Sequence, residues 1–159
     1  MSLEIEQPDM KEVFEQLIAT EDKLAIQDFL NDQNISDVAE LINDYPEYES
    51  QIVANMAINR AASVFKILDI SQQKDIVKEL PTAKTAELLN ELPADDRTDF
   101  LEELPKAVIR DLIKLLDPEE RKITLSLLGY PEDSVGRLMT PDYVYVYAHN
   151  TVADVFRTI

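Results

Sequence analysis

Leucine recurs every twelve residues through the second half of the chain, and this period limits the possible folds more than any other feature. The leucines form one column of equivalent positions, and two more apolar columns follow the same period. The second is broken once, by Thr124, and the third is unbroken. At i, i+1 and i+4 within each unit, the three columns share one face of an α-helix. The columns are Leu68, Leu80, Leu92, Leu104, Leu116 and Leu128; Ile52, Val64, Ile76, Leu88, Phe100 and Leu112; and Val53, Phe65, Val77, Leu89, Leu101, Ile113 and Leu125.

Prolines punctuate the same register, since Pro81, Pro93 and Pro105 each follow a repeat leucine. Proline suits the first helical position, and its recurrence forbids one continuous helix. Each unit is therefore predicted to be a short helix of about 8–9 residues and a tight turn, too short to be stable alone. Stacking buries the leucine faces, so the register over residues 44–128 predicts an all-α superhelical stack, an α-solenoid with about 12 residues per helix-turn unit.

The first 43 residues have helical periodicity but are out of phase with the repeat. Three helices are expected there, over residues 10–18, 24–30 and 35–43. An atypical repeat at the end of an array usually caps it. Tyr45 and Tyr48, near the start of the register, are expected to be packing residues. We therefore assign residues 1–128 to one helical-repeat domain.

The pattern changes at Gly129, which follows Leu128 where a helix C-cap is expected. Residues 129–137 form a predicted linker. Residues 143–147 are dense in Tyr and Val and are typical of a β-strand. A helix over 152–159, capped by Asn150 or Thr151, follows. Residues 138–159 are thus expected to be the incomplete β-α start of a second domain.

The charge excludes several classes of function. There are 15 Lys and Arg against 32 Asp and Glu, a formal net charge of −17. Nucleic acids and anionic lipids require a basic face, so neither is an expected partner, whereas cations and basic proteins are. With no cysteine and His149 alone, the chain has no thiolate nucleophile and no multi-histidine metal site. No catalytic constellation is present, and no apolar run reaches the about 18 residues of a membrane span.

The segment Gly136-Arg137-Leu138-Met139-Thr140-Pro141-Asp142-Tyr143-Val144, preceded by residues 115–121 and 130–136, indicates a family. It resembles the junction between the cytosolic N domain and the first CBS domain of MgtE-type magnesium transporters. The resemblance implies a longer protein with a CBS pair, a connecting helix and a transmembrane pore domain, assembled as a homodimer. It places this chain at the cytoplasmic face of the membrane, without insertion of its own, and makes residues 138–159 a truncated first CBS domain.

Asp95 and Asp99 are the candidate metal ligands. They are spaced i, i+4 on one predicted helix, where two like charges destabilise the helix by roughly 0.2–0.5 kcal/mol. Mg²⁺ accepts oxygen ligands, retains several waters and often uses only one or two carboxylates. The alternative is structural: Asp95 and Asp96 favour a helix N-terminus and Asp99 lies on a solvated face.

The resemblance implies that regulatory Mg²⁺ binds between the N domain and the CBS domains. The positions of the family's Mg²⁺ ligands correspond to Asp95, Asp99 and the main chain of Arg137 in this sequence. A further acidic ligand of the family falls near Ser63, which is not a carboxylate, and the chain departs from the pattern there. Two other acidic pairs, Glu102-Glu103 and Glu119-Glu120, are expected to be solvated surface.

Two functions follow as hypotheses. The first is a Mg²⁺-sensing regulatory domain that gates Mg²⁺ uptake by Mg²⁺-dependent association with the CBS domains. The second is an acidic helical-repeat scaffold that binds a basic protein and has no metal-sensing role. Short helical repeats of this kind also resemble the armadillo-like repeats of flagellar motor switch proteins. Neither hypothesis makes the chain an enzyme.

Overall fold

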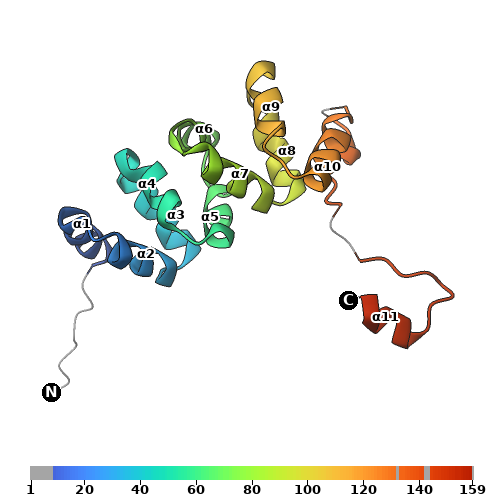
Figure 1. Cartoon of the computed structure of the whole chain (residues 1–159), viewed down its shortest axis with the longest axis horizontal. Coiled ribbons are helices and arrows are strands. Elements are labelled where there is room, and N and C mark those ends of the chain that lie inside the picture. The colour runs from blue at the N-terminus through green and yellow to red at the C-terminus, as the bar shows by residue number, and fades with distance from the viewer. Residues whose placement is uncertain (1–8, 132, 142–143, 159) are drawn as a thin grey trace.

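The computed structural model of the chain describes residues 9–131, 133–141 and 144–158. Within these residues, every regular element is a helix (Figure 1). Two are short 3-10 helices, η1 and η2. The elements are α1 (Met10–Thr20), α2 (Lys23–Asp32), α3 (Ile35–Asp44), η1 (Pro46–Tyr48), α4 (Glu49–Asn55), α5 (Ile58–Phe65), α6 (Ile70–Glu79), α7 (Thr82–Glu91), α8 (Ala94–Glu102), α9 (Lys106–Ile113), α10 (Pro118–Leu128), η2 (Val135–Leu138) and α11 (Val152–Thr158).

Helices two apart in the chain pack against each other, which is the arrangement of an α-solenoid. One row joins α2, α4 and α6, another joins α3, α5 and α7, and α8 packs on α10. Figure 1 shows α1 to α10 following one another along the long axis of the stack. The predicted fold is confirmed. In the described part of the chain, no helix is both long and apolar enough to cross a bilayer.

The repeat leucines form much of the core, although not uniformly. Leu68, Leu80, Leu92 and Leu116 are buried. Leu104 and Leu128 are only partly buried. Thr124 does not break the buried column as its polarity suggests, because it is 0% exposed and its hydroxyl is used in a hydrogen bond described below.

The prolines lie one position earlier than predicted. Pro81, Pro93 and Pro105 are N-cap residues, and their helices begin at the next residue. The N-cap carbonyl makes the first intrahelical hydrogen bond: that of Pro93, for example, accepts from the N–H of Arg97 at 2.9 Å. The N–H of an N-cap residue makes no intrahelical hydrogen bond, so proline, which has no N–H, costs the helix no hydrogen bond at this position.

Every second unit carries a polar side chain that caps the helix before it. Gln73, Arg97 and Arg121 are 24 residues apart and donate to carbonyl groups at the end of the preceding helix. Nε2 of Gln73 donates to Phe65 at 2.8 Å, Nη1 of Arg97 to Leu89 and Leu92 at 3.0 Å, and Arg121 to Ile113 at 3.0 Å and to Lys114 and Leu116 at 2.9 Å.

Glu49 occupies the same column one period earlier, yet an ionised carboxylate cannot donate to a carbonyl. It is only 8% exposed. Burial raises the pKa of Glu49, and the negative charges of Asp75, Glu79 and Asp69 raise it further. The first capping position of the column thus holds an acid that is destabilised in its charged form.

The three predicted N-terminal helices are confirmed as α1, α2 and α3. Phe14, which is 1% exposed, packs its ring against Tyr45 and Tyr48 at centroid distances of 5.3 and 6.0 Å. The tyrosines are therefore packing residues, as predicted. The Tyr45 hydroxyl also donates to a carboxylate oxygen of Glu15 at 2.7 Å.

The predicted strand is wrong for the residues that the structure describes. Residues 144–147 form no strand, because a strand needs a partner for its backbone hydrogen bonds and the described residues supply none there. Tyr143, the first residue of the predicted strand, lies outside the described residues. The predicted helix forms as α11, with Thr151 as its cap, and Ile159 lies outside the described residues. Figure 1 shows α11 lying apart from the helical stack.

Candidate metal-binding surface

Helix α8 concentrates five carboxylates on one side: Asp95 and Asp96 in its first turn, Asp99 in its middle, Glu102 as its last residue and Glu103 as its C-cap. At 100° per residue, their side chains occupy an arc of about 120° centred near Asp99. We call these five residues the acidic face of α8. The opposite side of the same helix is buried.

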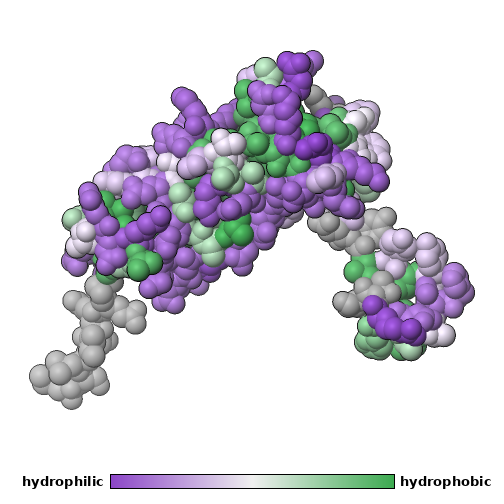
Figure 2. Space-filling view, viewed as in Figure 1, coloured by the Kyte–Doolittle hydropathy of each residue, from purple (hydrophilic) through white to green (hydrophobic). Residues whose placement is uncertain are grey.

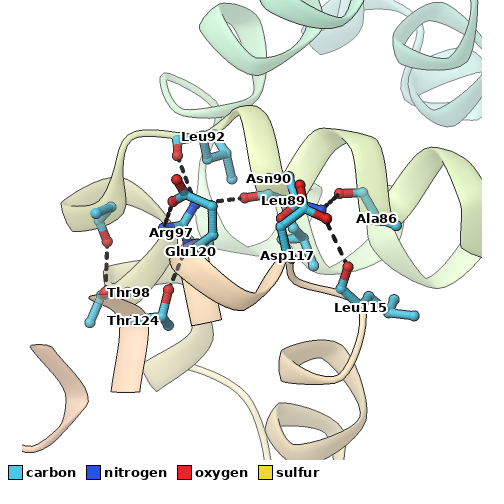
Figure 3. A network of polar contacts seen from close by, with 11 residues as sticks. Ala86, Leu89, Asn90, Leu92, Arg97, Thr98, Leu115, Asp117, Glu120 and Thr124 are labelled. Carbon is cyan, nitrogen blue, oxygen red and sulfur yellow. Dashed lines mark hydrogen bonds and ion pairs between the residues drawn. The ribbon is translucent and has the colours of Figure 1, made fainter. Parts of the chain in front are cut away.

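Arg97 is the main anchor of that buried side, and its side chain is 0% exposed (Figure 3). Its Nη1 donates to the carbonyls of Leu89 and Leu92, and its Nε donates to Oγ1 of Thr124 at 2.8 Å. Its Nη2 pairs with the carboxylate of Glu120 on α10. All the contacts of Arg97 point inward, so α8 is fixed between α7 and α10 with its acidic face outward.

Two cations flank the acidic face, one at each edge. At one edge the side chain of Arg137, from η2, pairs with Glu102 and donates from Nη1 to the carbonyl of Leu127 at 2.8 Å. At the other edge Nζ of Lys66, at the end of α5, lies 3.8 Å from a carboxylate oxygen of Asp96. Asp95, Asp99 and Glu103 make no ion pair in the described part of the chain.

A groove of about 270 Å³ runs beside the acidic face, between α8 and the turn that joins α5 to α6. Apolar side chains form much of its lining, and Asp96, Asp99, Glu103 and Lys66 supply its charged groups. The apolar part of the lining is Phe65, Leu68, Ile70, Leu92 and Phe100. The carboxylates of Asp96 and Asp99 are therefore partly shielded from water.

The electrostatics of the face follow from this shielding and from crowding. Partial burial raises the pKa of Asp99, and the charges of Asp95 and Asp96 raise it further, while the Arg137 guanidinium opposes the shift. Partial burial and Asp95 likewise raise the pKa of Asp96, against the opposing effect of Lys66. The face thus carries more negative charge than its own cations balance, and a bound cation would relieve the repulsion.

The donor set fits Mg²⁺ as part of a coordination shell. Oδ1 of Asp95 is buried and has no hydrogen-bond partner within the described structure, so one carboxylate oxygen is available as an acceptor. Carboxylate oxygens are the ligands that Mg²⁺ prefers. Within the described residues, however, no three Asp, Glu, His or Cys side chains converge on a point that could hold a metal ion. An ion held at Asp95 and Asp99 would therefore need water and a second surface to complete its coordination.

The structure places two of the predicted ligands, Asp95 and Asp99, on one helix face, with the side chain of Arg137 nearby. Asp95 and Asp99 share the acidic face, and the Arg137 side chain is close enough to Asp99 to oppose its pKa shift. The predicted role of Arg137 concerns its main chain, whose N–H donates to the carbonyl of Ser134 at 3.0 Å. Ser63, at the position where the family pattern has an acid, donates its hydroxyl to the carbonyl of Asn59 within its own helix at 2.8 Å.

Sequence reasoning missed the place of Asp96 on the acidic face, Lys66 and the structural role of Arg97. It was also wrong about Glu102 and Glu120, which are partly buried partners of Arg137 and Arg97 and not solvated surface. A buried arginine is rare and is not expected from a pattern of apolar residues. The available signal was the 24-residue spacing of Gln73, Arg97 and Arg121.

Comparisons with known proteins identify the family of the chain. The family model of the MgtE intracellular N domain matches residues 33–133. A structure of the cytosolic domain of the Mg²⁺ channel MgtE in complex with ATP is 30% identical, with a TM-score of 0.85, over 92% of this chain and 61% of that one. A structure of the soluble part of a magnesium transporter shares the fold at 22% identity, with a TM-score of 0.76, over 94% of this chain and 61% of that one.

The chain thus spans about three fifths of each of these solved structures, 61% in both cases. A search among curated proteins found no match. The family model covers more than half of the chain, from just after α2 to just beyond α10, and includes the whole acidic face of α8. The chain belongs to the MgtE intracellular N-domain family.

Proposed function

We propose that this chain is the Mg²⁺-sensing regulatory domain of a magnesium transporter or channel, on the cytoplasmic side of the membrane. Family membership and the 30% identical structure of an MgtE cytosolic domain support a place in such a protein. The observation that carries the sensing role is the acidic face of α8. Its charge is unbalanced, and its Asp95 has a buried oxygen without a hydrogen-bond partner.

The proposed mechanism is electrostatic. When Mg²⁺ is scarce, the acidic face repels an acidic surface on the CBS pair of the same full-length protein, and the domain swings away. When Mg²⁺ is abundant, ions between the two surfaces replace repulsion with shared coordination and stabilise a compact state. An ion can shift this equilibrium only because it binds one state more tightly than the other. In the homodimeric full-length protein, the compact state closes the pore and so limits further uptake.

The residues of this chain have separate roles in the proposal. Asp95 and Asp99 supply carboxylate oxygens, and the main chain of Arg137 supplies a carbonyl. Arg97 does not contact the ion, but its buried hydrogen bonds set the position of the helix that carries both aspartates. Mg²⁺ itself supplies the positive charge that offsets the repulsion between the two surfaces.

The test is a Mg²⁺ titration of the chain extended through both CBS domains, with the radius of gyration measured by small-angle scattering. We expect compaction in the millimolar range, weakened in an Asp95→Ala/Asp99→Ala variant. Asp28→Ala/Asp32→Ala is the matched control, since it removes two aspartates at the same i, i+4 spacing from α2. Equal compaction in the parent and Asp95→Ala/Asp99→Ala proteins would show that the Mg²⁺ ligands are other residues. No compaction in the parent would favour an acidic scaffold.

A further inference from the structure

We propose that Lys66 is a tethered counter-cation of the acidic face, which Mg²⁺ displaces and which thereby sets the Mg²⁺ concentration at which the domain responds. The inference rests on the proposed function, because it concerns regulation of the same surface. It adds a residue on another helix, α5, to a site that was assigned from α8 and the segment around Arg137.

The position of Lys66 supports this role. Its side chain lines the same groove as Asp96 and Asp99, and its ammonium nitrogen lies 3.8 Å from Oδ2 of Asp96. This separation is longer than a hydrogen bond, so electrostatic attraction alone holds the pair. The side chains of Lys66 and Asp96 are 40% and 35% exposed, which puts the pair at the mouth of the groove, where an ion enters from solvent.

The other flanking cation behaves differently. Arg137 is 7% exposed, and its guanidinium is committed both to Glu102 and to the carbonyl of Leu127. Displacing Arg137 would leave buried polar groups without partners, which costs free energy. Displacing Lys66 would only return a hydrated ammonium on a flexible four-carbon stem to solvent. Of the two cations, Lys66 is therefore the exchangeable one.

Competition follows from charge and space. A divalent ion held at Asp95 and Asp99 repels an ammonium at the neighbouring Asp96, so each cation weakens the binding of the other. The free energy of the Lys66–Asp96 attraction is then subtracted from that of Mg²⁺ binding. Exposed ion pairs of this kind are weak, so removing the Lys66 ammonium is expected to shift the Mg²⁺ midpoint by roughly two- to fivefold.

The experiment follows the amide resonances of α8 by NMR in the 159-residue chain during a titration with MgCl₂ at constant ionic strength. Lys66→Gln removes the ammonium and should lower the midpoint by about two- to fivefold. Lys66→Arg retains the charge and should keep the parent midpoint to within about twofold. Lys23→Gln is the matched control, since it makes the same charge change at an exposed lysine of α2 and should leave the midpoint unchanged.

A second readout reports displacement directly. The Nζ resonance of Lys66 should move toward that of a free lysine as Mg²⁺ is added, while that of Lys23 should not. An unchanged midpoint in Lys66→Gln, or an equal shift in Lys23→Gln, would overturn the inference and leave the proposed function intact. If the α8 resonances of the parent chain do not respond to Mg²⁺, the proposed Mg²⁺ site on α8 fails, and the inference fails with it.

Discussion

Nε of Arg97 donates a hydrogen bond to Oγ1 of Thr124, 27 residues further along the chain, at 2.8 Å in a fully buried setting. Thr124 stands in a column that is otherwise apolar, and Arg97 stands on the inner side of an otherwise acidic helix. A buried arginine and a buried threonine would each leave polar atoms without partners, and here each side chain supplies the partner of the other. The pair joins α8 to α10 and fixes the direction in which the acidic face points.

Replacing Arg97 should therefore destabilise the stack strongly. Arg97→Met keeps an apolar stem but leaves the carbonyls of Leu89 and Leu92, the Thr124 hydroxyl and Glu120 without a donor. We expect a loss of about 3–5 kcal/mol in the free energy of unfolding, as when one partner of a buried ion pair is removed. Chemical denaturation measures it. Arg110→Met, at an exposed position of α9, should cost less than about 0.5 kcal/mol. Similar losses in both variants would contradict the anchoring role.

The buried acid at the first capping position predicts a pH-dependent gain of stability in Glu49→Gln. Burial raises the pKa of Glu49 in the folded state, so ionisation at neutral pH opposes folding. The penalty grows as pH rises through the unfolded pKa and is complete above the folded pKa. It is absent below about pH 4, where the carboxyl is protonated in both states. Glutamine can also donate to a carbonyl, as Gln73 does.

We expect Glu49→Gln to be more stable than the parent by roughly 0.5–1.5 kcal/mol at pH 7, with the difference shrinking toward pH 4. Denaturant unfolding at several pH values measures this dependence. Glu47→Gln, at an exposed site two residues earlier, should show no comparable change. A gain for Glu49→Gln that is the same at pH 4 and pH 7 would show that charge is not the cause.

Gly136 allows the close packing that positions Arg137. A Cβ at this residue would lie 2.6 Å from Cδ1 of the Tyr130 ring, so Gly136→Ala forces the ring or η2 to move. We expect reduced amide-exchange protection of the Arg137 N–H, which donates to the Ser134 carbonyl, and a weaker Mg²⁺ response. The Gly136→Ala/Tyr130→Ala variant removes the clash and should restore protection. Full protection in Gly136→Ala alone would refute the packing argument.

The segment after η2 should contribute little to the stability of the stack. Val152 and Phe156 of α11 are 72% and 76% exposed, and Val144 to Tyr147 are each at least 50% exposed. Deleting residues 139–159 should therefore change the free energy of unfolding of the stack by less than about 0.5 kcal/mol. Thermal unfolding of the two chains tests this. A large loss of stability would mean that the segment packs on the stack.

The repeat was predictable because the leucine period reports directly which faces must be buried, and the all-helical stack followed from it. The candidate aspartates were also predictable, since i, i+4 spacing places Asp95 and Asp99 on one helix face. That residues 144–147 form no strand was not predictable from their composition, because a strand depends on partners that local sequence does not describe. The Arg97 network, Lys66 and the orphaned oxygen of Asp95 depend on contacts between units, which a pattern within one unit cannot report.

The surface near the far end of the stack also carries apolar residues. Figure 2 shows hydrophobic residues gathered around α9 and α10, on an otherwise largely hydrophilic face. Val108 and Leu125 there are 41% and 50% exposed. Among the described residues no further pair of repeat helices packs on α10, so Leu125 is exposed although the same column is buried at Phe65, Leu89 and Leu101.

The most direct test of the account compares the radius of gyration of the chain extended through both CBS domains in Mg²⁺ and in NaCl of equal ionic strength. The account predicts compaction in Mg²⁺ alone, because bridging requires a coordinated divalent ion and general screening does not suffice. Equal compaction in NaCl would show that screening relieves the repulsion, and no compaction in either salt would show that the acidic face of α8 is not a Mg²⁺ sensor.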